Sequence, residues 1–123
     1  MKSILIAEDH RDLAEMFRLA LEPLDVHVRV ALDGRSALSQ AREHLPDLAL
    51  LDIGLPEMDG FEVCRQLRAL PGGRDIRIVA LTTWATEADR LHGVAAGFDE
   101  HWAKPLGLEL LQTLVRRHLA VAA

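Results

Sequence analysis

Four apolar stretches of this sequence end in polar side chains that could do chemistry together. The polar residues that follow these stretches are Glu8 and Asp9, Asp52, Thr82 and Lys104. Short apolar runs of this kind are typical of strands in a buried parallel sheet. The carboxyl ends of parallel strands meet at one edge of a sheet, where ligands bind in open α/β folds. These residues are therefore predicted to gather at one site.

The chemistry that such a set could perform is phosphoryl transfer. Three carboxylates close together repel one another unless a hard divalent cation lies between them, and Mg²⁺ prefers oxygen ligands. The ammonium of Lys104 can neutralise a phosphoryl group, and the hydroxyl of Thr82 can donate a hydrogen bond to one of its oxygens. An aspartate in this setting is a candidate nucleophile toward phosphorus. Taken singly, the same residues could be a surface lysine, a strand-end hydroxyl and a helix-capping pair.

Asp52 lies at the centre of this prediction. The apolar run at residues 48–51 fits a central strand, and Gly54 and Gly60 interrupt regular structure soon after it. Asp59 is predicted to cap a helix that begins near Gly60. The alternative is that Asp52 only ends a strand, as aspartate often does.

The elements that must position these side chains alternate along the chain. Strands are predicted at residues 3–7, 26–31, 48–52, 76–81 and 98–103, and helices at residues 11–22, 33–44, 60–70, 86–96 and 106–119. This alternation predicts an α/β fold in which a parallel sheet carries helices on both faces through right-handed crossovers. The second strand alternates apolar and polar side chains, which indicates an edge strand.

The fourth and fifth helices carry the least regular apolar patterns. Nearly all the apolar content of the fourth helix is Leu91, Val94 and Ala95, so this helix is predicted to be loosely held. The residues of the fifth helix that suit the core are Leu108, Leu111, Val115 and Leu119. Those of a second apolar stripe are Leu110, Leu114 and Val121. This second stripe is either a partner surface or a sign of wider burial.

Composition indicates an ordinary soluble domain. The 123 residues are 50% hydrophobic and 27% charged, which fits one domain over residues 1–123. No apolar run approaches the roughly 20 residues that span a membrane, and no signal-peptide pattern is visible, so a cytoplasmic protein is expected. The single cysteine, Cys64, excludes an internal disulfide. With a net charge of −5 and no basic block, direct binding of nucleic acid is not expected.

In their order along the chain, the motifs resemble those of a response-regulator receiver domain. The motifs are the acidic pair Glu8-Asp9, Asp52 with the segment 55–60, Thr82 after an apolar strand, and Lys104-Pro105 after the segment 97–100. The resemblance covers residues 4–119. It implies the flavodoxin-like (βα)5 fold, a doubly wound parallel five-stranded sheet of order 2-1-3-4-5 with helices on both faces.

The resemblance implies a role for each member of the acidic cluster. Asp52 would accept a phosphoryl group from a phosphohistidine on a sensor histidine kinase or a histidine phosphotransfer protein. Glu8 and Asp9 would hold Mg²⁺ together with Asp52 and the backbone carbonyl of Gly54. The protein would be a signalling switch that catalyses its own phosphorylation and dephosphorylation, and not a conventional enzyme.

The resemblance also implies how the phosphoryl group is sensed. Thr82 would be the switch hydroxyl that moves toward it, and Lys104 would be its counter-charge. A cis peptide bond is expected before Pro105. The surface of the fourth helix, fifth strand and fifth helix would then control a partner or an output, and in receivers this surface often forms a homodimer.

Four positions depart from the family pattern or modulate the site. Receivers usually carry Tyr or Phe three positions before the lysine, where this chain has His101. The hypothesis is that His101 substitutes for that residue and makes the active state depend on pH. Thr83 stands where Ala, Gly or Ser is usual, and its bulk would narrow access to the phosphoryl group. Gly54 offers no side chain to guide water and Trp84 could shield the site, which predicts slow loss of phosphate.

Two other functions fit the same residues. A small Mg²⁺-dependent phosphatase would use Asp52 as a turnover nucleophile, although no insertion that builds a substrate pocket is apparent. A receiver that has lost its chemistry would act only as a docking module, an alternative that His101 and Thr83 leave open.

Overall fold

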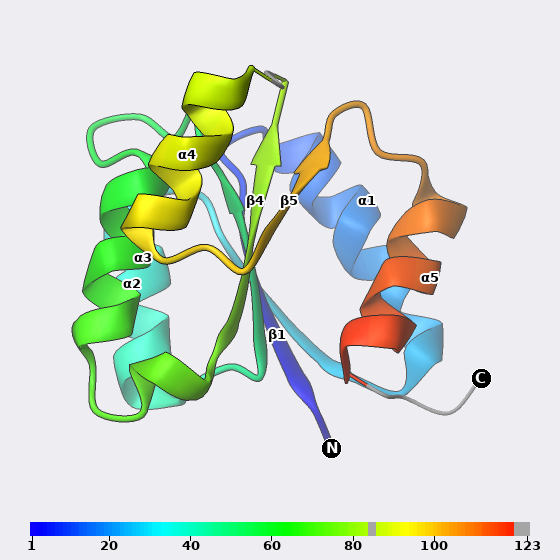
Figure 1. Cartoon of the computed structure of the whole chain (residues 1–123). Helices are drawn as coiled ribbons and strands as arrows, with labels where there is room; N and C mark the ends of the chain where they lie inside the picture. The colour runs from blue at the N-terminus through cyan, green and yellow to red at the C-terminus, as the bar shows by residue number, and fades with distance from the viewer. Residues whose placement is uncertain (84–85, 120–123) are drawn as a thin grey trace.

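Five parallel strands form one sheet in the order β2-β1-β3-β4-β5 (Figure 1). The computed structural model describes residues 1–83 and 86–119. The strands are β1 (Ser3–Ala7), β2 (His27–Ala31), β3 (Leu48–Asp52), β4 (Arg77–Thr82) and β5 (Glu100–Ala103). The α-helices are α1 (Arg11–Leu21), α2 (Gly34–Glu43), α3 (Gly60–Ala69), α4 (Glu87–Ala96) and α5 (Leu108–Leu119), and short 3-10 turns lie at Glu22–Leu24 and Gly73–Asp75. The predicted flavodoxin-like strand order is confirmed.

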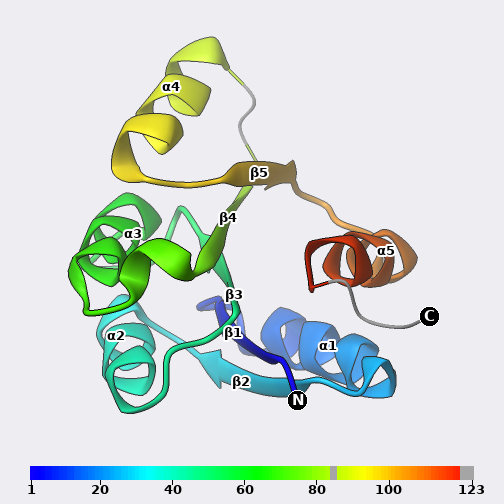
Figure 2. The same ribbon diagram turned by 60° about the horizontal axis from the view of Figure 1, so that its bottom comes forward.

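Helices cover both faces of the sheet. Figure 1 and Figure 2 show α2, α3 and α4 on one face and α1 and α5 on the other. Neighbouring residues of a strand point to opposite faces, so Leu5 packs in the first core with Phe61, while Ile6 packs in the second with Phe17 and Leu111. β1 and β3 are buried along their whole length, and β2 is the half-exposed edge strand that its alternating pattern predicted. In the described part of the chain, no helix is long and apolar enough to cross a membrane.

Side-chain caps mark where α3 and α4 begin. Asp59 accepts a hydrogen bond from a backbone N–H of the first turn of α3, as predicted. Thr86 accepts a hydrogen bond from the N–H of Asp89 and donates its hydroxyl to the same residue's carboxylate, so this pair caps the start of α4. A Cβ on Gly60 would lie 2.6 Å from the carbonyl oxygen of Asp52. Glycine therefore allows α3 to start directly against the end of β3, and this holds the loop after Asp52.

The apolar side chains of α4 do not form its buried face. Leu91 is 54% and Val94 is 59% exposed, and Ala95 is exposed as well. The buried residues of the helix are Gly93 and Ala96. The fully buried residues of α4 are therefore among its smallest, and they bury little apolar area.

The residues of α5 that were predicted to pack in the core are buried, except for the first of them, Leu108. Leu111 is fully buried, with Val115 and Leu119, whereas Leu108 is 38% exposed because it is the first residue of the helix and has no preceding turn to cover it. In the second stripe, Leu110 is exposed and Leu114 packs against the core. Val121 lies outside the described residues.

Candidate functional site

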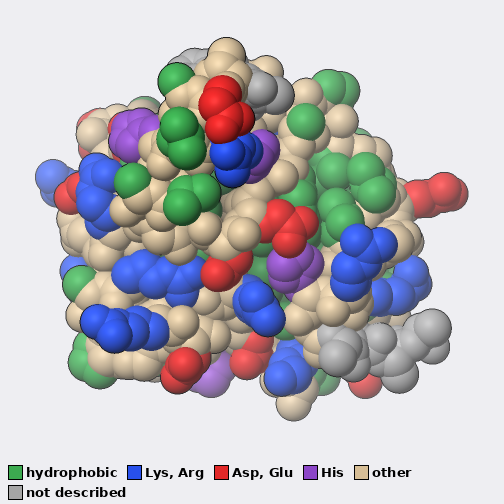
Figure 3. Space-filling model, viewed as in Figure 1, with side chains coloured by type: hydrophobic (Ala, Val, Ile, Leu, Met, Phe, Trp, Pro, Cys, Tyr) green, Lys and Arg blue, Asp and Glu red, His purple; other side chains and the backbone are tan. Residues whose placement is uncertain are grey.

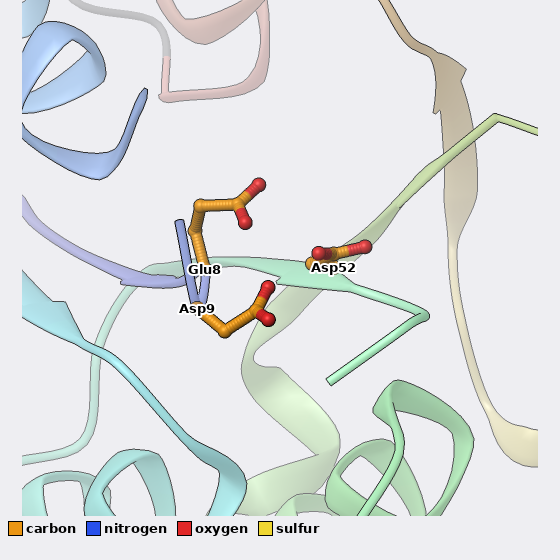
Figure 4. A group of neighbouring side chains, drawn as sticks. All are labelled: Glu8, Asp9 and Asp52. Carbon is orange, nitrogen blue, oxygen red and sulfur yellow. The ribbon is translucent and has the colours of Figure 1, made fainter. Parts of the chain in front are cut away.

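Three carboxylates converge at the carboxyl edge of the sheet. Glu8 and Asp9 follow β1, Asp52 ends β3, and the last residue of β1, Ala7, pairs with Leu51. One oxygen of each carboxylate lies within 4.8 Å of the others. Figure 4 shows the three carboxylate groups facing a common space. The shared edge that was inferred from the strand ends is present.

Lys104, the residue that follows β5, extends its side chain to this cluster. Its Nζ lies 2.6 Å from Oε1 of Glu8 and 3.3 Å from Oδ2 of Asp52. The side chain of Glu8 is only 1% exposed, so the ammonium of Lys104 is the counter-charge that makes its burial tolerable. Burial raises the pKa of Glu8 above its ordinary value, and the hydrogen bonds from Lys104 and His10 oppose that rise. Burial lowers the pKa of Lys104, but the hydrogen bond to Glu8 and the charge of Asp52 outweigh it and leave that pKa above its ordinary value.

Strand pairing brings Thr82 to the same edge. Asp52 pairs with Leu81 across β3 and β4, so Thr82 lies one residue further along β4. Thr82 in turn pairs with Ala103 of β5. The backbone N–H of Lys104 donates to the carbonyl oxygen of Thr82 over 2.8 Å. The buried threonine and the lysine are therefore held beside each other by main-chain pairing.

A cavity of about 270 Å³ lies beneath α4, next to this edge. Both Thr82 and His101 line it, together with apolar side chains that include Phe61 and Phe98. His101 is exposed on β5 and its neighbour in the sheet is Ala80. Because strand side chains alternate, the next residue of β5 is buried in the core on the α1 and α5 side. His101 is thus on the correct face to enter the cavity.

The other predicted positions lie around the site. The backbone N–H of Gly54 donates to Oδ1 of Asp52 over 3.1 Å. The peptide bond between Lys104 and Pro105 is cis, as expected. Thr83 is exposed just beyond β4, and Trp84 lies outside the described residues, so their effects on access and phosphate loss stay predictions.

His10 is a site residue that the sequence analysis did not single out. Its Nδ1 accepts a hydrogen bond from the N–H of Leu13 and caps α1, while its own backbone N–H donates to Oε2 of Glu8 over 3.0 Å. His10 therefore orients a member of the acidic cluster. Its place just before the first turn of α1 was the available signal, but histidine is not among the preferred capping residues.

Comparison with known proteins identifies the family. A family model described as the response regulator receiver domain matches residues 4–116. The chain belongs to the response regulator receiver family. Receiver domains are signalling domains of two-component systems, and the fold and the acidic cluster of this one agree with that assignment.

Relatives of this receiver domain include proteins of very different length. It is 37% identical over 118 residues to an uncharacterized 14.6 kDa protein from the sodA1 3′ region of Leptolyngbya boryana, with 95% of this chain and 90% of that protein aligned. It is 39% identical over 113 residues to the response regulator MprA of Mycolicibacterium vanbaalenii, where 92% of this chain aligns with 48% of MprA. The receiver domain therefore spans about half the length of MprA.

A solved receiver domain shows the same fold with a metal ion bound. It is the receiver domain of the sensor histidine kinase PA1611 from Pseudomonas aeruginosa, which has a TM-score of 0.86, 32% identity and coverage of 97% of this chain and 98% of that one. In that protein a magnesium ion is coordinated in the active-site cleft. The described part of the present receiver domain contains an acidic cluster of Glu8, Asp9 and Asp52.

Proposed function

We propose that this receiver domain is a phosphoacceptor switch in which Asp52 takes a phosphoryl group from a phosphohistidine. The observation that supports this most is the convergence of Asp52 with Glu8, Asp9 and Lys104 at one edge of the sheet. A domain that served only for docking would not need this set of charges. The donor would be a sensor histidine kinase or a histidine phosphotransfer protein, acting in the cytoplasm.

In the proposed reaction, a carboxylate oxygen of Asp52 forms a bond to phosphorus while the bond from phosphorus to the imidazole nitrogen of the donor breaks. The donor imidazole takes up a proton from solvent as it leaves, and Asp52 becomes an acyl phosphate. Contacts on both oxygens orient the carboxylate: Gly54 donates to Oδ1, and Lys104 lies 3.3 Å from Oδ2. Lys104 also supplies positive charge next to the incoming phosphoryl group.

The donor set fits a magnesium ion. Its ligands would be carboxylate oxygens of Glu8, Asp9 and Asp52 and the backbone carbonyl of Gly54, all of the hard oxygen type that Mg²⁺ prefers. When bound, the ion supplies positive charge that neutralises phosphoryl oxygens. The metal-bound PA1611 receiver supports this assignment.

The phosphoryl group is then sensed by Thr82 and Lys104. We expect Lys104 to exchange its contact with Asp52 for a phosphoryl oxygen, and Thr82 to donate its hydroxyl to another. Thr82 also lines the cavity beneath α4, so its movement alters what α4 and His101 pack against. The exposed large apolar side chains of α4 and α5 include Leu91, Val94 and Leu110. Figure 3 shows green hydrophobic areas on the face that carries these two helices. We propose this surface as the contact for a partner or for a second copy of the domain.

His101 would fill the place of the usual aromatic switch residue. Its ring borders the cavity from β5, and a protonated imidazole favours contact with water over contact with the apolar side chains that line the cavity. We expect the response to beryllofluoride with Mg²⁺, measured by tryptophan fluorescence, to be weaker near pH 6 than near pH 8. A His101→Tyr protein is expected to respond equally at both pH values. Identical pH profiles for the two proteins would exclude this role of His101.

The acceptor can be identified by chemical trapping. After treatment with acetyl phosphate and Mg²⁺, borohydride reduces an aspartyl phosphate to homoserine, and peptide mass analysis locates the changed residue. We expect the change at Asp52 alone. Modification at Asp9, or at no residue in a preparation whose mass shows a bound phosphoryl group, would refute the proposed acceptor.

A further inference from the structure

The loop between β3 and α3 is attached to the sheet and to α3 at its start. The backbone N–H of Ile53 donates to the carbonyl oxygen of Leu81 over 3.1 Å, and the carbonyl oxygen of Ile53 accepts from the N–H of Gly60 over 3.0 Å. Gly54, whose carbonyl oxygen is a proposed ligand of Mg²⁺, directly follows Ile53. This oxygen lies just beyond the two bonds, so its position depends on how the rest of the loop is held.

The rest of the loop contains a tight turn at residues 56–58. The N–H of Met58 donates to the carbonyl oxygen of Pro56 over 2.7 Å. Glu57, between them, has a φ of 66°, in the left-handed region that a residue with a side chain adopts only where its surroundings enforce it. Contacts outside the turn must therefore hold these three residues in place.

Gly34, the first residue of α2, lies against this turn. It is buried, and Figure 1 and Figure 2 show α2 beside α3, the helix that follows the loop. A Cβ on Gly34 would lie 2.9 Å from the carbonyl oxygen of Met58 and 2.7 Å from Cγ2 of Val63. Both distances are too short for a real Cβ, so any side chain at this position must displace the loop, α3 or both.

A displaced turn would shift Gly54 as well. Only Leu55 separates Gly54 from the turn, and the backbone of Leu55 is restricted because a proline, Pro56, follows it. Leu55 is also buried, in the same core as Val63. The segment between Met58 and Gly54 therefore has little freedom to absorb a shift.

We propose that Gly34 is a positioning residue of the magnesium site, because it lets α2 support the turn at residues 56–58 and so places the carbonyl oxygen of Gly54. The inference rests on the proposed phosphoacceptor function and on the Mg²⁺ that this function uses. Gly34 supplies no ligand itself, and its effect passes through Met58 and Leu55. Changing a group that holds a metal ligand in place typically lowers metal affinity by about 10–100-fold.

Titration of ¹⁵N-labelled protein with MgCl₂, followed by the amide chemical shifts, measures this effect. In a Gly34→Ala protein, the dissociation constant for Mg²⁺ is expected to rise about tenfold. Gly93→Ala is the matched control, because Gly93 is also buried in a helix but a Cβ there would meet its neighbours at 3.7 and 4.0 Å. This control is expected to bind Mg²⁺ as tightly as the parent protein. Parent-like affinity in Gly34→Ala would overturn the proposal.

A double substitution separates the loop from the core. Val63→Ala removes the Cγ2 atom that a Cβ on Gly34 would strike, but leaves the carbonyl oxygen of Met58 in place. The Gly34→Ala/Val63→Ala protein is therefore expected to bind Mg²⁺ as weakly as Gly34→Ala, while Val63→Ala alone keeps the parent affinity. Recovery of the parent affinity in the double variant would refute the path through Met58.

The double variant also decides the proposal if Gly34→Ala alone does not fold. Its Mg²⁺ affinity is then compared with that of Val63→Ala, and equal affinities would overturn the proposal. Failure of the double variant to fold would assign Gly34 to the stability of the fold alone, and would overturn the proposal as well.

The rate of phosphoryl uptake distinguishes this proposal from the proposed function. Uptake from acetyl phosphate, followed by intact mass, is measured at increasing concentrations of MgCl₂. Gly34→Ala is expected to need about tenfold more MgCl₂ for half-maximal uptake and to reach the parent rate at saturation, which a loss of stability alone would not produce. No uptake by the parent protein would refute the proposed function, whereas a parent-like Mg²⁺ dependence in Gly34→Ala refutes only the role of Gly34.

Discussion

An Arg68→Ala protein is expected to lose about 3 kcal/mol of its free energy of unfolding. The substitution leaves the carbonyl oxygens of Gly73, Ile76 and Gly97 without their charged donor and leaves Asp99 without its counter-ion. Hydrogen bonds to a charged group contribute roughly 1.5–3 kcal/mol each. The expected loss of free energy is smaller than their sum because water can solvate the partly exposed carboxylate of Asp99. Urea denaturation followed by far-UV circular dichroism measures the loss.

Arg65→Ala is the matched control for this prediction. Arg65 lies on the same helix and forms an ion pair with Glu62, but both side chains are more than 40% exposed. Such surface pairs contribute little, so the control is expected to lose less than about 0.5 kcal/mol. Equal losses for the two variants would show that the Arg68 contacts do not hold the loop after α4.

A Lys104→Met protein is expected to lose about 2–3 kcal/mol of stability at neutral pH without Mg²⁺. The substitution removes the counter-ion of Glu8, which is almost fully buried, and removes the cation nearest to Asp52. Removing one partner of a buried ion pair leaves an uncompensated buried charge, which is more destabilising than replacing both partners by apolar side chains. Lys2→Met is the control, because Lys2 is exposed at the N-terminus and carries the same charge.

The deficit of Lys104→Met is expected to shrink as the pH falls. Burial already raises the pKa of Glu8 in the parent protein, and loss of Lys104 removes a contact that lowers it. A carboxyl whose folded pKa is above its unfolded value favours folding below the unfolded value, near 4.5, and this contribution is lost as the pH rises through the folded pKa. Thermal melts between about pH 5 and pH 8 test this, and a deficit that is constant over that range would contradict the role assigned to Glu8.

The sheet and most of the site could be predicted because each depends on local patterns. Apolar runs that end in Asp52 or Thr82 place these residues at strand ends, and parallel pairing then brings the strand ends together. Asp59 and Thr86 mark helix starts through contacts within one turn, which a sequence displays directly. The cis bond before Pro105 was expected from the family resemblance.

The features that escaped prediction depend on contacts between distant segments. Arg68 and Asp99 are 31 positions apart, and nothing in their immediate sequence distinguishes them from other surface charges. The stacking of His92 on Phe61 likewise joins two separate helices. For α4, the weak apolar pattern predicted a loosely held helix but not its orientation. Tertiary packing buried Gly93 and left the larger side chains outside.

The ion pair between Lys104 and Glu8 was not predicted from the sequence. Sequence reasoning brought both residues to one edge and assigned Lys104 to the phosphoryl group. The structure shows that Lys104 already bonds Glu8, 2.6 Å away, and lies further from Asp52, at 3.3 Å. The longer side chain of glutamate, compared with aspartate, lets this buried carboxylate reach the ammonium. A change of partner by Lys104 is therefore part of the switch that we propose.

Intact mass after exposure to acetyl phosphate with Mg²⁺ tests the central claim most directly. We expect a gain of one phosphoryl group in the parent protein, and none in an Asp52→Asn protein or in a parent sample treated with EDTA. The isosteric asparagine keeps the size of the side chain, so a loss of uptake reports the missing nucleophile. Uptake that persists in Asp52→Asn, or no uptake in the parent protein where a known receiver is labelled, would contradict the assignment of Asp52 as the phosphoacceptor.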